Sequence, residues 1–263
     1  MRANRGECLC TLRPGQQYLW TVSTEQADAK IACRLQVVLS KDEQEEGRRF
    51  HHARDRHQFI ITRALVRLVL SHHFPVPAND WRFGRDHNRK PFITSPRGAP
   101  AVQFSLSHTD GLIACLITLS AQAAVDVERI EYSEDLPLVA RQVLSPAELR
   151  ALNNLSGRDW TARFFDFWTL KEAYAKARGM GLGLRLSDIQ FELGTKEILA
   201  HFDSSIGDDA SAWVFWNRQL PSKHTISVAT KKDFDCQLEV VRRSVKFDGI
   251  STSRSIAYEE WPE

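Results

Sequence analysis

Four charged residues in the second half of the sequence have the types and spacing to bind a metal ion and a phosphate group. Asp126 and Glu128 lie two positions apart in a strand-like segment, so they share one strand face. Two carboxylates placed in this way repel each other unless a cation lies between them, and their oxygens suit Mg²⁺ or Mn²⁺. Glu172 and Lys176 stand four positions apart in a helical segment, so they can meet one ligand. A half-exposed acidic strand and a helix with a surface Glu–Lys pair would also account for these residues.

Basic residues are concentrated in the first half of the sequence. Between Arg48 and Arg97 there are eleven Lys or Arg residues against three Asp residues. Arg56, Arg63 and Arg67 fall on one line of the long helix expected over Ala53–His73. Arginines in such a line either extend to solvent or bind an anion.

A strand expected over Val102–Ser107 delivers Ser107 and His108 to a turn at Thr109-Asp110-Gly111. A hydroxyl, an imidazole and the N–H groups of such a turn can donate to phosphate oxygens. The alternative is that Ser107 and Thr109 only stabilise the turn and that His108 is exposed. The pair does not indicate a hydrolase, because adjacent strand residues point oppositely and no acidic third member is evident.

Hydrophobic periodicity predicts the helices and strands that position these residues. The central helix covers Phe164–Gly183 and ends at a glycine cap, and capped helices begin at Ser40 and Ser145. We expect Ala123–Ile130 to pair with the buried strand Leu112–Leu119, and the polar tail from Arg242 onward to be poorly ordered. The remaining expected elements are a helix over Ala29–Val38 and strands over Tyr18–Val22, Trp81–Phe83, Pro91–Ile93, Ile189–Leu193, Trp213–Asn217, His224–Ala229 and Leu238–Val241.

The composition is that of an ordinary globular protein. The 263 residues are 43% hydrophobic and 26% charged, and the net charge of +2 indicates no general affinity for nucleic acid. Five cysteines without paired spacing indicate reduced thiols. No apolar stretch has the length of a signal peptide or a membrane span, so we expect a cytoplasmic protein.

Five motifs in this order resemble the Sfp-type 4′-phosphopantetheinyl transferases. They are LSKDEQEEGRRF followed by DR, then RKP, FSLSHT, AVDVE and FWTLKEAYAKARGMGL, over Leu39–Phe191. The resemblance implies an α+β fold: a pseudo-twofold monomer of two similar halves, each a small antiparallel sheet packed on a long helix. We place the N-terminal half at residues 1–120 and the C-terminal half at residues 121–263.

The resemblance also implies an activity. Members of this family transfer the phosphopantetheine arm of coenzyme A to a serine of an apo acyl or peptidyl carrier protein. The reaction depends on Mg²⁺ or Mn²⁺ and releases adenosine 3′,5′-bisphosphate. Two alternatives rest on the residues alone. The carboxylates would suit a metal-dependent phosphodiesterase, and the basic block would suit a nucleic-acid-binding module, although no recognisable nucleic-acid motif is present.

The family's residue roles carry over by motif. The metal carboxylates are Asp126, Glu128 and Glu172, with Glu172 also the expected general base. The contacts to coenzyme A are Lys90, Ser107, His108, Lys171 and Lys176, together with the less strictly patterned Arg49, Arg56 and Arg63. Lys171 and Lys176 are also expected to stabilise charge on the pyrophosphate. Arg89 replaces the glycine of the family's GKP motif, and Glu43 and Glu46 stand where the best-known member has lysines.

Overall fold

Two compact units make up the chain in the computed structural model. The structure describes residues 12–13, 15–87, 90–96, 102–119, 122–180, 183–195, 197–232, 239–247 and 256–261. The first unit contains Met1–His87, Pro91–Leu119 and Gln237–Glu263, and the second contains Asn88–Lys90 and Ser120–Cys236. Each unit combines a sheet with one long helix.

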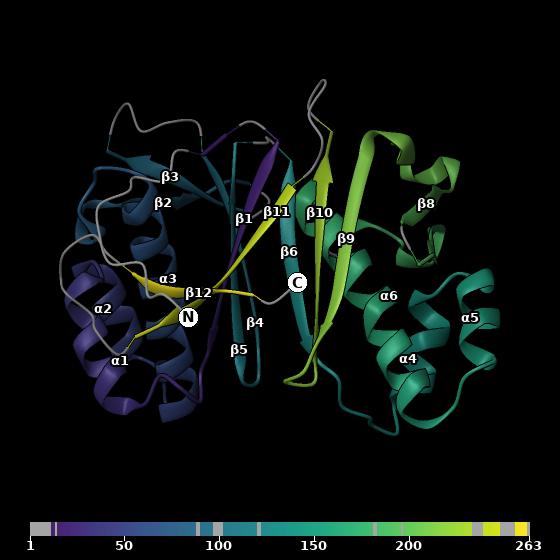
Figure 1. Cartoon of the computed structure of the whole chain (residues 1–263), viewed down its shortest axis with the longest axis horizontal. Coiled ribbons are helices and arrows are strands. Elements are labelled where there is room, and N and C mark those ends of the chain that lie inside the picture. The colour runs from purple at the N-terminus through teal and green to yellow at the C-terminus, as the bar shows by residue number, and fades with distance from the viewer. Residues whose placement is uncertain are drawn as a thin grey trace. The chain divides into compact units, whose positions relative to one another are not determined.

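The first unit is built on a five-stranded sheet in the order β12-β11-β1-β5-β4, with a separate β2-β3 hairpin. Its helices α1, α2 and α3 lie together on one side of this sheet (Figure 1). The strands are β1 (Gln16–Ser23), β2 (Arg82–Arg85), β3 (Pro91–Ser95), β4 (Gln103–Thr109), β5 (Leu112–Thr118), β11 (Glu239–Lys246) and β12 (Ala257–Glu260), and the helices are α1 (Ala29–Leu35), α2 (Lys41–Arg48) and α3 (Ala53–His73).

Local sequence explains why these helices form where they do. Ser40 caps α2 through a complete capping box with Glu43, which satisfies two backbone N–H groups. The 21 residues of α3 coincide with the predicted helix, and its apolar positions pack with Trp20 and Ile113 in one core. Burial of α3 against the sheet supplies the stabilisation that an isolated helix lacks.

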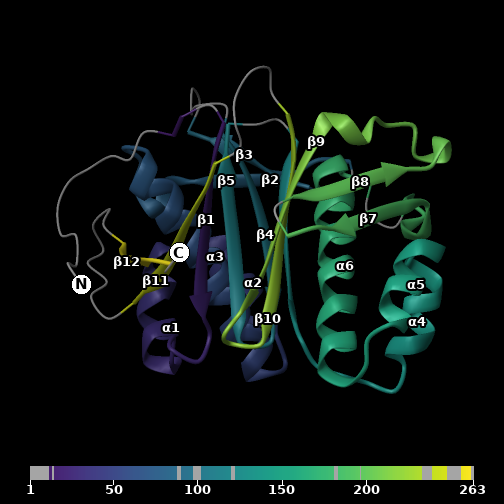
Figure 2. The ribbon, with the colours of Figure 1, turned by 45° about the vertical axis from the view of Figure 1, so that its right-hand side comes forward.

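The second unit has a three-stranded sheet in the order β6-β10-β9 and a β7-β8 hairpin. Helix α6 lies between this sheet and the pair α4 and α5 (Figure 2). The strands are β6 (Ala123–Arg129), β7 (Ile189–Leu193), β8 (Ile198–Phe202), β9 (Trp213–Leu220) and β10 (His224–Lys231), and the helices are α4 (Leu136–Val143), α5 (Pro146–Asn153) and α6 (Gly157–Arg178).

Helix α6 begins earlier than the predicted segment and ends where the glycine cap was expected. Ser156 is its N-cap residue, and Gly179 follows its last turn with a φ of 67°. The left-handed conformation at Gly179 lets its N–H reach the carbonyls of Ala175 and Lys176, which ends the helix without strain. Glu172 and Lys176 therefore lie in the last two turns of a helix of 22 residues.

Two predictions about strand pairing are wrong. We expected β6 to pair with β5, but β5 already has β1 on one edge and β4 on the other. The partner of β6 is β10, in the sheet of the second unit. The first unit's sheet is not purely antiparallel either, because β1 and β11 run parallel.

The C-terminal tail also differs from its prediction. We expected it to be poorly ordered and to belong to the C-terminal half, yet β11 continues to Lys246 and groups with the first unit. Val245 and Phe247 are buried in the first unit's core. The Arg243 guanidinium lies 4.4 Å from the ring centroid of Tyr258 and 5.0 Å from that of Trp20. The described parts of the tail, residues 242–247 and 256–261, are ordered because strand alternation buries these side chains, although the segment is rich in polar residues.

The predicted α+β class is confirmed, with a sheet and one long helix in each unit. Among the described residues, no helix has the length and apolar character needed to cross a membrane. Cys33 and Cys115, the two cysteines within the described ranges, are free thiols.

Candidate active site

Strand β6 presents its carboxylates on the sheet face that α6 covers. Asp126 pairs with Ser227 of β10, and Glu128 pairs with Thr225. Val125 and Val127 are fully buried, and Asp126 is only 3% exposed, so the strand has no acidic outer face at this position. Glu128 is half-buried. The predicted alternation of valines and carboxylates is confirmed. The alternative of a half-exposed acidic strand is wrong at Asp126, because this side chain is buried.

Helix α6 brings a cation to one of these carboxylates. The Nζ atom of Lys176 lies 2.5 Å from Oδ1 of Asp126, although the two residues are 50 positions apart in sequence. Burial and the negative charge of Asp126 raise the pKa of Glu172, while Lys176 acts in the opposite direction. Asp126, Glu172 and Lys176 thus form one electrostatic group between β6 and α6.

Lys171 does not belong to this group, which corrects its predicted role. Its side chain is fully buried, with Nζ 2.8 Å from Oε2 of Glu148 on α5. Nζ also donates to the carbonyls of Leu186, at 2.8 Å, and Ile189. Five helix positions separate Lys171 from Lys176, which turns the two side chains about 140° apart. Lys171 therefore faces α5 and β7 and not the β6 carboxylates.

The Glu148–Lys171 pair has complete hydrogen bonding. Glu148 accepts from the backbone N–H of Ser145 at 2.7 Å and from that of Phe191 at 2.8 Å. Burial lowers the pKa of Lys171, and the negative charge of Glu148 counteracts this. A buried charge without such partners would be costly, so the pair fixes α6 against α5 and β7.

The donor set of β6 and α6 is suited to a divalent cation. The ammonium group of Lys176 already pairs with Asp126, which shows that this carboxylate accepts a cationic partner. Asp126 and Glu172 carry like charges that repel each other, and a bound cation would offset this repulsion. Carboxylate oxygens are the ligands that Mg²⁺ and Mn²⁺ prefer. Within the described ranges, no group of three or more His, Cys, Asp or Glu side chains is already arranged to hold a metal ion. Asp126 and Glu172 are the side chains that fit this role best.

In the first unit, the two phosphate-contact candidates on β4 differ in exposure. Ser107 is 6% exposed, whereas His108 is exposed. The two side chains alternate across the strand, as predicted. Gln58 of α3 donates to the carbonyl of Thr109 at 3.1 Å, which ties α3 to the end of β4. His108 is the more accessible of the two to a ligand.

The three arginines in line on α3 have three different environments. Arg56 is exposed, and Arg63 is half-buried with its Nε 3.9 Å from Oε1 of Glu43. Arg67 is 1% exposed and donates to Glu43 Oε2 at 2.8 Å and to the carbonyls of Ala78 and Trp81. Arg56 is therefore available to a ligand in solvent, whereas Arg67 stabilises the fold.

The remaining predicted contacts lie outside this line. Arg49 is exposed at the C-cap of α2, and Lys90 is half-buried just before β3. Arg89 falls outside the described residues. Glu43, noted as a departure from the family pattern, is buried and neutralises Arg67.

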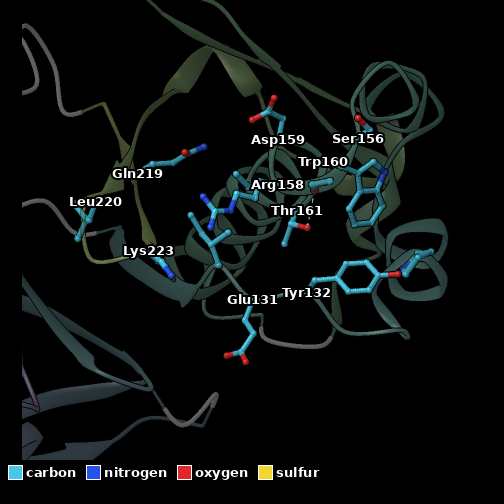
Figure 3. A pocket seen from close by; sticks show the side chains of 14 residues that line it. Glu131, Tyr132, Ser156, Arg158, Asp159, Trp160, Thr161, Gln219, Leu220 and Lys223 are labelled. Carbon is cyan, nitrogen blue, oxygen red and sulfur yellow. Dashed lines mark hydrogen bonds between the residues drawn. The ribbon is translucent and has the colours of Figure 1, made fainter.

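A cavity of about 940 Å³ that sequence reasoning missed lies in the second unit, beside the N-terminal end of α6. Tyr132 and Trp160 line one side, and Gln219 and Lys223 of the β9–β10 hairpin line the other (Figure 3). Ile130, the first residue after β6, also lines it. Tyr132 is 60% exposed, so a large aromatic ring faces solvent at this cavity. In the sequence, the signal for this cavity is limited to the aromatic residue in the loop after the AVDVE motif.

Comparisons with known proteins cover both halves of the chain. A family profile described as "4'-phosphopantetheinyl transferase, N-terminal" matches residues 19–120. A second, the "4'-phosphopantetheinyl transferase superfamily", matches residues 122–229. The two profiles describe one class of transferase.

Curated relatives agree with these profiles. The 4′-phosphopantetheinyl transferase HetI of Nostoc sp. is 28% identical over 71% of this chain and 78% of its own. A phosphopantetheinyl transferase of Thraustochytrium sp. is 29% identical over 75% of this chain and 72% of its own. The 4′-phosphopantetheinyl transferase Sfp of Bacillus subtilis is 28% identical over 61% of this chain and 69% of its own. The chain belongs to the 4′-phosphopantetheinyl transferase superfamily, and the predictions of family and enzyme class are confirmed.

Proposed function

We propose that this enzyme transfers the 4′-phosphopantetheine arm of coenzyme A to a serine of an apo acyl or peptidyl carrier protein, with Mg²⁺ or Mn²⁺ as cofactor. The observation that carries the proposal is the group formed by Asp126, Glu172 and Lys176, in which two carboxylates and one ammonium lie together between β6 and α6. Such a group can bind a metal–pyrophosphate complex and accept a proton. Family membership supplies the phosphopantetheine arm as the group transferred.

The reaction joins the serine oxygen to the β-phosphorus of coenzyme A and breaks the bond to adenosine 3′,5′-bisphosphate. In phosphoryl transfers of this kind, positioning and charge neutralisation provide most of the rate. A divalent cation bound by Asp126, Glu172 and Glu128 would neutralise the pyrophosphate oxygens. The ammonium of Lys176 can stabilise the charge that grows on the leaving bisphosphate.

Glu172 is the residue that we assign to the serine proton. Burial raises the pKa of Glu172, and a carboxylate with a raised pKa is a stronger base than an ordinary one, which suits Glu172 to this role. Its position one turn before Lys176 keeps the base beside the group that stabilises charge.

The first unit offers donors for the phosphates and nucleotide of coenzyme A. Arg49, Arg56 and His108 are exposed candidates, with the half-buried Arg63 and the buried Ser107 as further contacts. In the second unit Lys90 has the same proposed role, whereas Lys171 does not. We further propose that the enzyme acts as a monomer in the cytoplasm and that it binds neither nucleic acid nor membranes.

Intact-mass measurement of several apo carrier proteins, incubated with the enzyme, coenzyme A and Mg²⁺, tests this proposal. Transfer makes the carrier heavier by one phosphopantetheine arm and produces adenosine 3′,5′-bisphosphate. A phosphodiesterase would instead release free phosphopantetheine and leave the carrier mass unchanged. Substitution of the acceptor serine by alanine provides the control, because it must abolish the mass gain.

A further inference from the structure

Buried polar side chains join α6 to β9 and β10 on the sheet face that carries the β6 carboxylates. Asp166 of α6 is only 4% exposed. Its Oδ1 accepts from Thr225 Oγ1 at 2.9 Å, and its Oδ2 accepts from Gln219 Nε2 at 2.8 Å. Arg163 lies 3.7 Å from Oδ2 and is partly exposed. Asp166 is therefore a buried carboxylate held mainly by neutral donors from the sheet.

The network continues toward the catalytic end of α6. Thr169, one turn after Asp166, lies with its Oγ1 2.7 Å from Ser227 Oγ. Asn217 donates to Ser227 Oγ at 3.0 Å and to Thr225 Oγ1 at 3.2 Å, which joins the two parts. Thr169, Ser227 and Thr225 are all almost completely buried. On α6 the network thus spans about one turn, from Asp166 to Thr169, and ends about one turn before Glu172.

The same strand positions carry the network and the β6 carboxylates. Ser227 is the cross-strand partner of Asp126, and Thr225 is the partner of Glu128. Directly paired residues in an antiparallel sheet place their side chains on one face. The hydrogen bonds from α6 are therefore made to the residues next to the two carboxylates.

Stability alone does not explain a buried carboxylate here. Well-packed apolar side chains are often as stabilising as a buried ionised group, and elsewhere α6 is buried through Phe164, Leu170 and Ala173. Apolar contacts have no direction, so they do not by themselves fix the rotation of a helix on a sheet, and the Glu148–Lys171 pair fixes α6 against α5 and β7 but not against β9 and β10. Hydrogen bonds with defined partners permit only one position of the helix.

We propose that Asp166 is a positioning residue for the transfer reaction. Through Thr225 and Gln219 it holds α6 at the height and rotation at which Glu172 and Lys176 meet Asp126. The inference rests on the proposed function, since the reaction gives this alignment its purpose. We assign Asp166 no contact with the metal ion or with the reacting atoms.

Variants of Thr225 provide a matched test. Thr225→Val keeps the shape of the side chain but removes the donor to Asp166, whereas Thr225→Ser keeps the donor. We expect Thr225→Val, and Asp166→Leu more strongly, to lower kcat at least about tenfold, with the KM for coenzyme A unchanged. Thr225→Ser should retain wild-type kcat. Ile206→Ala, a change in the same unit's core outside the network, should lower stability and leave kcat within about twofold.

A second readout does not depend on turnover. Calorimetry of Mn²⁺ binding to the coenzyme A complex, without carrier protein, should show at least about tenfold weaker affinity for Thr225→Val and unchanged affinity for Thr225→Ser. If Thr225→Val is folded and keeps both the wild-type kcat and the wild-type Mn²⁺ affinity, the inference is wrong. If the wild-type protein binds Mn²⁺ but transfers no arm, the proposed function fails, while the Mn²⁺ comparison still decides the role of Asp166.

Discussion

The Nζ atom of Lys176 on α6 lies 2.5 Å from Oδ1 of Asp126 on β6. This ion pair joins two motifs 50 residues apart and places Glu172 in the field of both charges. It also shows which lysine of the WTLKEAYAK segment faces the carboxylate strand. The chemistry that we propose depends on this relationship between strand and helix.

Metal removal should abolish transfer. Asp126 and Glu172 are like charges whose repulsion a divalent cation would relieve, so the enzyme with chelator should lose essentially all activity. Added Mg²⁺ or Mn²⁺ should restore it. Full transfer after exhaustive chelation, verified by elemental analysis, would contradict the assignment of the carboxylates.

The pKa of Glu172 in the metal-free protein should respond in opposite directions to two substitutions. Asp126→Asn removes the like charge that raises this pKa, so the pKa should fall. Lys176→Met removes the cation that lowers it, so the pKa should rise further. Carbon-13 NMR titration of the glutamate carboxyls measures both shifts. Shifts of the same sign in both variants would show that Glu172 lies outside this group.

Single substitutions in the Glu148–Lys171 pair should destabilise the fold. Lys171→Met or Glu148→Gln leaves its partner buried with incomplete compensation, at a cost of about 3–5 kcal/mol in the free energy of unfolding. The double variant Lys171→Met/Glu148→Leu should recover part of this loss, because no charge is left buried without its partner, although the N–H groups of Ser145 and Phe191 lose their acceptor. Denaturant titration measures the three values.

The same double variant tests the corrected role of Lys171. Once folded, it should transfer the arm at a rate within about tenfold of wild type, because the Nζ of Lys171 is already engaged by Glu148 and by the carbonyls of Leu186 and Ile189. If the double variant were stable but had lost affinity for coenzyme A, Lys171 would be a pyrophosphate contact after all, as the family resemblance implies.

Two arginines from one line of α3 should behave differently. Arg56→Ala should weaken coenzyme A binding about 10- to 150-fold, the equivalent of one lost charged hydrogen bond, with little change in stability. Arg67→Met should instead lower the free energy of unfolding, because Glu43 and two carbonyls lose a buried donor. Calorimetry with coenzyme A and thermal unfolding separate the two effects. Wild-type affinity in Arg56→Ala would remove that residue from the site.

Local sequence predicted the parts of the fold that depend on local interactions. The capping boxes at Ser40 and Ser145, the full length of α3 and the glycine cap at Gly179 all follow from spacing within a few residues. Strand partners could not be predicted in this way. The pairing of β1 with β11 joins Gln16 to Glu239, and only packing in the folded chain selects it.

The candidate site shows the same division. Alternation along β6 and the four-residue spacing of Glu172 and Lys176 predicted their faces correctly. Lys171 was assigned with them by motif, but its contacts with Glu148 and Ile189 depend on α5 and β7, which the motif does not contain. Asp166 was missed because its partners Thr225 and Gln219 are more than 50 positions away.

The pH–rate profile of Glu172→Gln tests the central claim most directly. Because burial and Asp126 raise the folded-state pKa of Glu172, its ionised form opposes folding above that pKa, and the metal-free variant should be at least as stable as wild type. We predict that it takes up coenzyme A normally but transfers the arm at least about 100-fold more slowly, without the acidic limb that a titrating base gives the wild-type profile. Near-normal turnover with the wild-type acidic limb would contradict the account and place the base elsewhere.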